Sequence, residues 1–273
     1  MSNKIAFING KGGVGKTTGV FHVAGVLSKM GEKALVVDFD KQRNATSTLL
    51  MNNEVGLGGF SAFDALMGRC HPRDAVAAAL FQSRGNAAPK HYGVSCMRGD
   101  ARFGGLTMKG LGAKGAAFGN CLDAYAEAEG IGWVLVDMPP SNAAVNDLCF
   151  AHVADYVIVP FSSDVYSVQG YGDIMETVAK ARSANPRLNV LGIYLSRFGR
   201  GAAQSWVRDK LLGFGDVFID VQIPYAADIM ECAILGSPIS YYKNSEKSSS
   251  RRAYERLVDE IIRRVADKIV RVV

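Results

Sequence analysis

A glycine-rich stretch close to the N-terminus has the residue types and the spacing that bind the phosphates of a nucleotide. It fits the pattern G-x-x-x-x-G-K-[ST], whose glycines let backbone N–H groups approach phosphate oxygens without a Cβ in the way. The stretch consists of Gly10, Lys11, Gly12, Gly13, Val14, Gly15, Lys16, Thr17 and Thr18. We expect Lys16 to contact the β- and γ-phosphates and the Thr17 hydroxyl to bind Mg²⁺. The stretch therefore predicts a site for ATP and Mg²⁺.

The segments on either side have the structure that such a loop requires. Residues 4–8 are apolar after the first lysine and predict a short buried strand, and residues 20–29 predict a helix. A strand that leads through a glycine-rich turn into a helix brings the partial positive charge of the helix N-terminus to the phosphates. A chance glycine-rich turn would need neither neighbour, so nucleotide binding is the favoured interpretation.

Two apolar runs farther along the chain each end in aspartate. Residues 34–37 precede Asp38 and Asp40, and residues 133–136 precede Asp137. Both runs predict buried parallel strands, and ligands of open α/β sheets bind at the carboxyl ends of the strands. Asp38, Asp40 and Asp137 are therefore predicted to lie beside the phosphate loop, with Asp137 close to Mg²⁺ through a water. The alternative role for Asp40 is that of a helix cap.

Lys11 is a second lysine within the phosphate loop, and the binding of one nucleotide does not need it. With this lysine, the segment K-G-G-V-G-K-T-T resembles the deviant Walker-A loop of the ParA/MinD family of partitioning and positioning ATPases. The resemblance implies that Lys11 reaches across a dimer interface to the nucleotide of a partner subunit. A solvated loop lysine is the alternative for this residue.

The segment that contains the first two aspartates resembles the family pattern D-x-D-P-Q-G-N-A-T, with two departures. Lys41 stands in place of the proline and Arg43 in place of the glycine, so this loop is more basic than the pattern. The resemblance implies that Asp40 positions the attacking water and the Mg²⁺ shell. The expected catalytic residues are therefore Lys11, Lys16 and Asp40, and the expected metal-binding residues are Thr17, Asp40 and Asp137.

Two later segments resemble the parts of the family that surround the adenine. Arg197 follows the predicted strand of residues 189–195, where family members carry Asn-Arg or similar residues. Pro224 and Tyr225 belong to Ile-Pro-Tyr, which matches a turn that lies against the base. The resemblance therefore implies that Arg197, Pro224 and Tyr225 bind the nucleotide. It covers residues 4–51 and 133–265.

The composition is that of an ordinary globular protein. Of the 273 residues, 48% are apolar and 21% are charged, and the net charge of +5 permits an anionic partner without demanding one. No apolar run reaches the roughly 18 residues of a membrane-spanning helix, and the N-terminus lacks the form of a secretory signal. The five cysteines are scattered without a C-x-x-C, which indicates reduced, mostly buried thiols in the cytoplasm.

Apolar runs that alternate with helical stretches predict the fold. They indicate a single P-loop ATPase domain over residues 1–273, an α/β fold with a doubly wound, mostly parallel sheet of P-loop NTPase type. The apolar stripe of a C-terminal helix at about residues 249–273 is expected to pack against the sheet. A variable segment at about residues 52–122 has no assigned role.

Local patterns within the variable segment predict its elements. Residues 61–67 and 72–81 favour helices, and residues 92–97 favour a strand. Residues 99–119 carry many glycines, which predicts a partly looped segment.

The resemblance implies an Mg²⁺-dependent ATP hydrolase that forms a homodimer when it binds ATP. Plasmid and chromosome partition ATPases are the most similar in pattern. The leading interpretation is therefore a cytoplasmic, nucleoid-associated DNA-segregation ATPase, whose dimer binds non-specific DNA and is stimulated by a centromere-binding partner. The alternative is a MinD-like positioning ATPase that acts on a membrane or a protein cargo. A carboxylate-activating synthetase is more distant, because it would not need Lys11.

The basic residues expected to contact DNA form two groups. Arg197 and Arg200 match an R-x-x-R-like position of partition ATPases, and Arg251 and Arg252 lie in the basic C-terminal third. A further arginine of those relatives, after the Ile-Pro turn, is missing here, so the expected footprint moves toward the C-terminal residues. Solvated helix faces are the alternative, and the C-terminal helix is also open to contact with a membrane.

Overall fold

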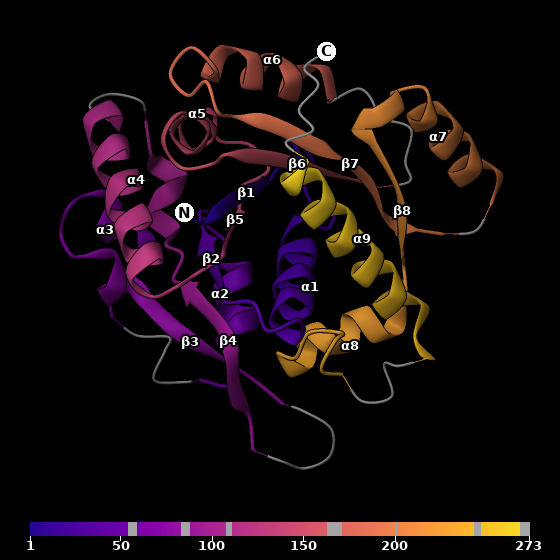
Figure 1. The fold of residues 1–273 in the computed structure, drawn as a ribbon, viewed down its shortest axis with the longest axis horizontal. Coiled ribbons are helices and arrows are strands. Elements are labelled where there is room, and N and C mark those ends of the chain that lie inside the picture. Colours follow the sequence, from indigo (N-terminus) through magenta and orange to yellow (C-terminus); the bar gives the residue numbers. More distant parts are fainter. Residues whose placement is uncertain are drawn as a thin grey trace.

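The strands form one sheet with the phosphate-loop strand near its centre. The computed structural model describes residues 1–53, 59–82, 88–107, 111–162, 171–199, 201–242 and 247–267. Its strands are β1 Asn3–Phe7, β2 Ala34–Asp38, β3 Val76–Phe81, β4 Lys90–Met97, β5 Trp133–Asp137, β6 Tyr156–Ser162, β7 Asn189–Phe198 and β8 Phe218–Pro224. Their order is β3-β4-β2-β5-β1-β6-β7-β8 (Figure 1). All neighbouring pairs are parallel except β3 with β4. The predicted doubly wound, mostly parallel fold is confirmed.

Helices cover both faces of this sheet. They are α1 Lys16–Lys29, α2 Asn44–Leu49, α3 Ala62–Leu66, α4 Leu111–Ala128, α5 Ala143–His152, α6 Tyr171–Ala181, α7 Ala202–Leu212, α8 Ala227–Leu235 and α9 Ser249–Ala266, with 3₁₀ turns η2 Pro72–Ala75, η3 Ala101–Gly105 and η5 Gly215–Val217. Along β1, Ile5 and Phe7 pack in a core with α1, α2, α8 and α9, whereas Ala6 packs in a core with α3 to α7. Two apolar cores therefore hold the central strands from opposite sides.

The central strands are buried on both faces, which explains their continuous apolar sequences. Every residue of β2 and of β5 is buried, including the aspartate that ends each strand. Strands in this setting lack the polar–apolar alternation of half-exposed sheets. The last residues of these strands point their carboxylates to the edge where the phosphate loop lies.

The variable segment differs from its predicted structure at residues 72–81. These residues form η2 followed by β3, where a helix was expected. Pro72 suits the first turn of the 3₁₀ helix, and β3 then pairs antiparallel with β4 at the sheet edge. Pairing at the edge overrides the helix preference of its three consecutive alanines, because propensity is a weak prior against tertiary contacts. The predicted strand at residues 92–97 is confirmed as part of β4.

The glycine-rich residues 99–119 are looped only in part, at residues 99–100 and 106–107 of the described chain, and most of their second half is helical. They include η3 and the first half of α4. A Cβ on Gly119 would lie 2.1 Å from the His152 carbonyl oxygen of α5, and one on Gly115 would lie 2.6 Å from the His152 ring. These glycines therefore allow α4 to approach α5 closely, a use that the sequence pattern alone does not distinguish from a loop.

The C-terminal helix packs as predicted. α9 lies against β8 and α1, and Leu257, Val258 and Ile261 on its apolar side are fully buried (Figure 1). Residues 268–273, the end of the predicted helix, lie outside the described residues. Within the described part of the chain, no helix combines the length and the apolar content that a membrane span needs. All five cysteines are free, and Cys96, Cys149 and Cys232 are buried.

Candidate nucleotide site

The phosphate loop joins the end of β1 to the start of α1 at the carboxyl edge of the sheet. Gly13 and Gly15 have φ angles of 75° and 93°, in the left-handed region that favours glycine. At Gly15, a Cβ would also lie 2.3 Å from the Ser196 Oγ of β7. The backbone therefore makes the tight turn that the motif predicts, in close contact with the end of β7.

Lys16 is buried and folds back over this loop. Its Nζ donates to the backbone oxygens of Asn9 and Lys11, both at 3.0 Å. Asn9 is itself fixed, since its side chain donates to the Pro160 oxygen at 2.9 Å and accepts from the Lys11 N–H at 2.9 Å. Burial lowers the pKa of Lys16, and nearby carboxylates act in the opposite direction. The ammonium group is thus held within the loop assigned to the phosphates.

Asp137 and Thr17 form the metal side of the site. Thr17 Oγ1 donates to Asp137 Oδ2 at 2.7 Å, whereas Asp137 Oδ1 is buried without a hydrogen-bond partner among the described residues. Burial raises the pKa of Asp137 well above its ordinary value, and the neighbouring Asp38 carboxylate adds to this. A buried carboxylate oxygen that lacks a partner, next to a threonine hydroxyl, is a suitable place for a cation.

Mg²⁺ in particular fits these residues. It is usually bound through one or two carboxylates together with waters and substrate phosphates. Among the described residues, no group of three or more acidic, histidine or cysteine side chains is placed to enclose a metal ion. Thr17 and Asp137 would hold Mg²⁺, which when bound neutralises charge on the transferred phosphoryl group.

Asp38 has a structural role that sequence reasoning missed. Its Oδ1 accepts from the Asp40 N–H at 3.0 Å, and its Oδ2 accepts from the Thr46 N–H at 2.9 Å and the Thr46 Oγ1 at 2.7 Å. Burial raises the pKa of Asp38 to about 6. With both oxygens occupied, Asp38 ties the end of β2 to α2. The aspartate two residues before Asp40 and the threonine eight residues after Asp38 were the available signals.

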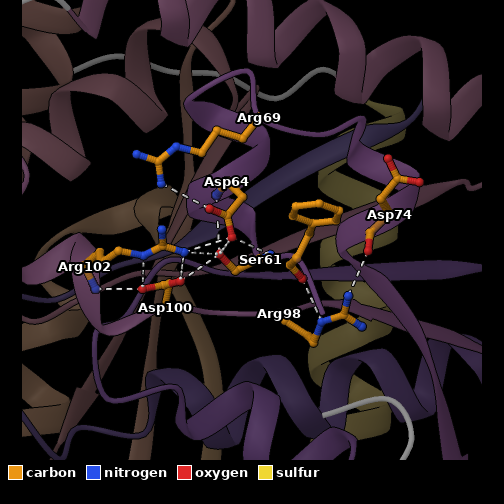
Figure 2. Close-up of polar contacts among 8 residues, drawn as sticks. Ser61, Asp64, Arg69, Asp74, Arg98, Asp100 and Arg102 are labelled. Atoms are coloured by element: carbon orange, nitrogen blue, oxygen red, sulfur yellow. Dashed lines mark hydrogen bonds and ion pairs between the residues drawn. The ribbon is translucent and has the colours of Figure 1, made fainter. Parts of the chain in front are cut away.

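Arginine–aspartate contacts fix the segment that supports Asp38 from the other side. Thr46 Oγ1 accepts from the Gly99 N–H at 2.7 Å, just beyond the end of β4. Figure 2 shows the network that follows: Arg102 lies between Asp100 and Asp64, and the Ser61 hydroxyl, which has one proton to donate, lies within hydrogen-bond distance of both aspartates. Hydrogen bonds from Arg102 lower the pKa of Asp100 to about 2. The network anchors α3 and η3 beside the nucleotide loops.

Arg98 anchors the same segment through backbone oxygens. It is 7% exposed, and its guanidinium donates to the Phe60 oxygen and the Asp74 oxygen, both at 2.8 Å (Figure 2). The first residues of the variable segment are therefore tied to the end of β4 and to η2.

Asp40 lies two residues past β2 and is 7% exposed. Its Oδ1 accepts from the Gln42 N–H at 2.9 Å, which orients the carboxylate within its own loop. Arg43 occupies the N-cap of α2, so Asp40 does not have the alternative role of capping that helix. Asp40 lines the same cavity as Thr17. Its action on the attacking water stays a prediction.

Arg197 and Tyr225 border the opposite side of the loop. The Arg197 guanidinium donates to the Gly13 oxygen at 2.7 Å, and its centre lies 4.9 Å from the centre of the Tyr225 ring. Arg197 therefore connects the end of β7 to the phosphate loop. This geometry places Arg197 against the phosphate loop, and both of its expected roles, nucleotide binding and contact with DNA, stay predictions.

One cavity of about 580 Å³ brings these segments together. The predicted residues that line it are Gly12, Gly13, Gly15, Lys16, Thr17, Thr18, Asp40, Arg197, Pro224 and Tyr225. The predicted nucleotide- and metal-binding residues that do not line the cavity are Gly10, Lys11, Val14 and Asp137, of which Val14 and Asp137 are buried. Sequence reasoning missed a further set: Gln42, Asn44, Thr48, Ile229, Met230 and Tyr254. The last three come from α8 and α9, for which no motif signal exists.

Comparisons with known proteins agree with this geometry. The family model AAA_31, an AAA domain, matches residues 2–190. The chromosome-partitioning ATPase Soj of Thermus thermophilus is 30% identical over 267 residues, which cover 97% of each chain. The chromosome partitioning protein ParA of Caulobacter vibrioides is 29% identical over 275 residues, 97% of this chain and 95% of that protein.

Solved structures show the same fold at lower identity. Cobyrinic acid a,c-diamide synthase from Mycobacterium smegmatis, with bound ADP and magnesium, has a TM-score of 0.77 at 22% identity, covering 98% of this chain and 97% of that one. The cell division ATPase MinD of Pyrococcus furiosus has a TM-score of 0.71 at 20% identity, covering 96% and 99%. The chain therefore belongs to the ParA/MinD family of P-loop ATPases and hydrolyses ATP.

Proposed function

We propose that this ATPase segregates DNA. Its ATP-bound dimer binds DNA without sequence preference, and a centromere-binding partner protein stimulates hydrolysis, in the cytoplasm at the nucleoid. The observation that carries the proposal is the match to the chromosome-partitioning ATPase Soj, which extends over 97% of both chains. A match over the whole length includes α8 and α9, beyond the phosphate loop that many unrelated ATPases share.

The proposed dimer depends on Lys11. Its main chain is fixed, since its N–H donates to Asn9 Oδ1 at 2.9 Å and its oxygen accepts from Lys16 Nζ at 3.0 Å. Lys11 is exposed to solvent, as contact with a facing subunit requires. A cation delivered by a partner would stabilise charge in the transition state, as an arginine finger does. Turnover would then depend on dimerisation.

Lys11→Ala tests the dimer. We expect weaker ATP-dependent dimers in light scattering and slower hydrolysis, while each monomer still binds nucleotide. Lys41→Ala is the matched control, because it removes an exposed loop lysine outside the phosphate loop. Dimerisation and turnover that are both unchanged in Lys11→Ala would reduce Lys11 to a solvated loop lysine.

Apart from Arg197 at the end of β7, the candidate DNA contacts in the described residues lie at the start of α9. Arg251 forms an ion pair with Glu255 at 2.6 Å, and Arg252 donates to the Lys247 oxygen at 3.3 Å. Arg200, the partner of Arg197 in the predicted motif, lies outside the described residues. Because Glu255 offsets the charge of Arg251, we expect Arg252 to contribute more to phosphate binding. Because the ion pair with Glu255 offsets part of the basic charge, we also expect a modest affinity for DNA, which depends on the dimer doubling the basic surface.

A titration of unrelated duplexes with ATP, with ADP and without nucleotide tests DNA binding. We expect binding with ATP that falls by roughly one logarithmic unit of affinity per logarithmic unit of salt for each phosphate neutralised. Arg251→Ala/Arg252→Ala should reduce both the affinity and this salt slope. Lys180→Ala is the control, because it removes an exposed charge from α6 on the other face of the sheet. Absence of binding at low salt would contradict the proposal.

A MinD-like action on a membrane is the alternative that the same experiment separates. The apolar side of α9 is buried against β8 and α1, so the helix would have to detach before it could enter a bilayer. This packing favours DNA as the partner. ATP-dependent binding to anionic liposomes, together with no DNA binding, would establish the alternative instead.

A further inference from the structure

Two arginines at the nucleotide site have an unusual backbone conformation. Among the described residues, Arg43 and Arg197 are the non-glycine residues with positive φ, at 56° and 52°. This left-handed region is unfavourable for residues with a Cβ, and such conformations cluster at functional sites. Arg197 already has a contact there, since its guanidinium donates to the Gly13 oxygen of the phosphate loop. Arg43 calls for a corresponding explanation.

Arg43 lies on the side of the cavity opposite to Arg197. It follows β2, which is separated from the phosphate-loop strand β1 by β5, while Arg197 lies at the end of β7, separated from β1 by β6. The Arg43 N–H donates to the Asp40 oxygen at 2.9 Å, and its neighbours Gln42 and Asn44 both line the cavity. Arg43 itself does not line the cavity; it lies between two residues that do, three residues from the carboxylate expected to position water.

The Arg43 side chain has no role within the described part of the protein that would explain its conformation. It is exposed, and its guanidinium forms no hydrogen bond or ion pair with other described residues. It does not cap α2 through its side chain. Lys41 on the same loop differs, because its aliphatic chain packs against η3, where a Cβ on Gly104 would lie 2.8 Å from Lys41 Cδ.

Glycine would suit this backbone better, so folding alone does not explain an arginine at this position. The cavity beside it is the one assigned to ATP, and a guanidinium binds phosphate oxygens through paired N–H groups. We propose that Arg43 binds the γ-phosphate of ATP and thereby sets the preference of this ATPase for ATP over ADP. The inference concerns the ATP site alone and does not depend on DNA segregation.

The test begins with Arg43→Gly and Arg43→Asn, because both residues tolerate positive φ and neither should unfold the protein. We expect melting temperatures at least equal to the parent for the glycine variant, together with a roughly tenfold loss of ATP affinity in equilibrium dialysis. ADP affinity should change less than twofold. Arg43→Lys should restore part of the ATP affinity, since it keeps the charge without the paired donors.

Lys41→Gly is the matched control, because it removes an equal charge from the same loop. We expect it to leave the ratio of ATP to ADP affinity unchanged. An unchanged ratio of ATP to ADP affinity in Arg43→Gly would overturn the proposal. An equal loss of ATP affinity in Lys41→Gly would also overturn it, because it would indicate a non-specific effect of the positive charge of the loop. A loss of DNA binding with an unchanged ATP-to-ADP ratio would also overturn it.

The γ-phosphate could belong to the same subunit or to a facing one, and mixed subunits separate these sources. Arg43→Gly is mixed with Lys16→Ala, which keeps Arg43 but cannot bind ATP tightly. If Arg43 acts within its own subunit, the mixture should bind ATP as weakly as Arg43→Gly alone. Recovery of ATP affinity in the mixture would assign the contact to the facing subunit. Either result supports the γ-phosphate contact once the ATP-to-ADP ratio has changed in the single variant.

Discussion

Asp38 and Asp137 end neighbouring strands at the same register, yet their surroundings give them different tasks. They are direct partners across β2 and β5, and both are fully buried. Three donors occupy the two oxygens of Asp38. Asp137 accepts only from Thr17 and keeps one oxygen without a partner among the described residues.

The role of a carboxylate at a strand end is therefore set by the hydrogen-bond donors around it and not by its position in the sheet alone. Both carboxylate oxygens of Asp38 accept hydrogen bonds that hold Asp40 and α2 in place, so neither oxygen is readily available to a ligand. Asp137 accepts from fewer donors, so the Thr17 hydroxyl and the nearby Lys16 offset only part of the energetic cost of its burial, and a bound cation would offset more. The following predictions distinguish residues that hold the site together from residues that act on ATP and Mg²⁺.

The largest expected effect is on stability, in Asp38→Asn. Either orientation of the amide turns an NH₂ group toward an N–H donor, of Asp40 or of Thr46. Loss of these buried hydrogen bonds should lower the free energy of unfolding by about 3 kcal/mol. Denaturant unfolding without nucleotide measures this. A stability equal to that of the parent would show that the hydrogen bonds from Asp40 and Thr46 to this carboxylate do not stabilise the fold, and Asp38 would then not differ from Asp137 in this respect.

Lys16→Ala should act on the ligand instead of the fold. Its ammonium group is held by the Asn9 and Lys11 oxygens within the phosphate loop. Removing it should weaken ATP binding by about 100-fold, roughly 2.7 kcal/mol. Equilibrium dialysis measures the affinity, and Lys33→Ala, an exposed lysine before β2, is the control. Unchanged affinity for ATP would contradict the assignment of the phosphate site.

Asp40→Ala should separate binding from hydrolysis. ATP affinity should stay within a few-fold of the parent, because the carboxylate is expected to act on water and not on the nucleotide itself. Hydrolysis should slow by roughly 30-fold, about 2 kcal/mol, and an ATP-bound dimer should accumulate in light scattering. Hydrolysis at the parental rate would exclude Asp40 from catalysis.

The parts of the site that were predictable from sequence are those with a motif or an uninterrupted apolar run. The phosphate loop, Asp40 and Asp137 follow from residue spacing and from the rule that parallel strands end at one edge. The cavity walls from α8 and α9 were not predictable. In the sequence, apolar residues such as Ile229 and Tyr254 indicate only that one side of each helix is buried. The structural role of Asp38 depends on donors from Thr46 that a linear pattern does not place.

The variable segment was less predictable because its elements depend on tertiary contacts. The alanines of β3 form a strand only because β4 offers an edge for pairing. Gly115 and Gly119 allow α4 to approach His152 closely, whereas in the sequence alone these glycines indicate a flexible loop. The assignment of residues 1–273 to one domain stays a prediction, as do the contacts of Arg200.

The smallest effect is expected for Asp137→Asn, the same substitution as at Asp38 on the neighbouring strand. Without ligand, its free energy of unfolding should stay within about 1 kcal/mol of the parent, because among the described residues only the Thr17 hydroxyl forms a hydrogen bond with this side chain, and it can bond to an amide as well. The thermal stabilisation by ATP should lose its dependence on Mg²⁺, which corresponds to about a tenfold loss of Mg²⁺-dependent affinity. Melting curves with ATP at several Mg²⁺ concentrations measure this, and Asp38→Asn, which should keep the Mg²⁺ response despite its lower stability, is the control. If both variants lost stability equally and both kept the Mg²⁺ response, the two aspartates would have the same structural task.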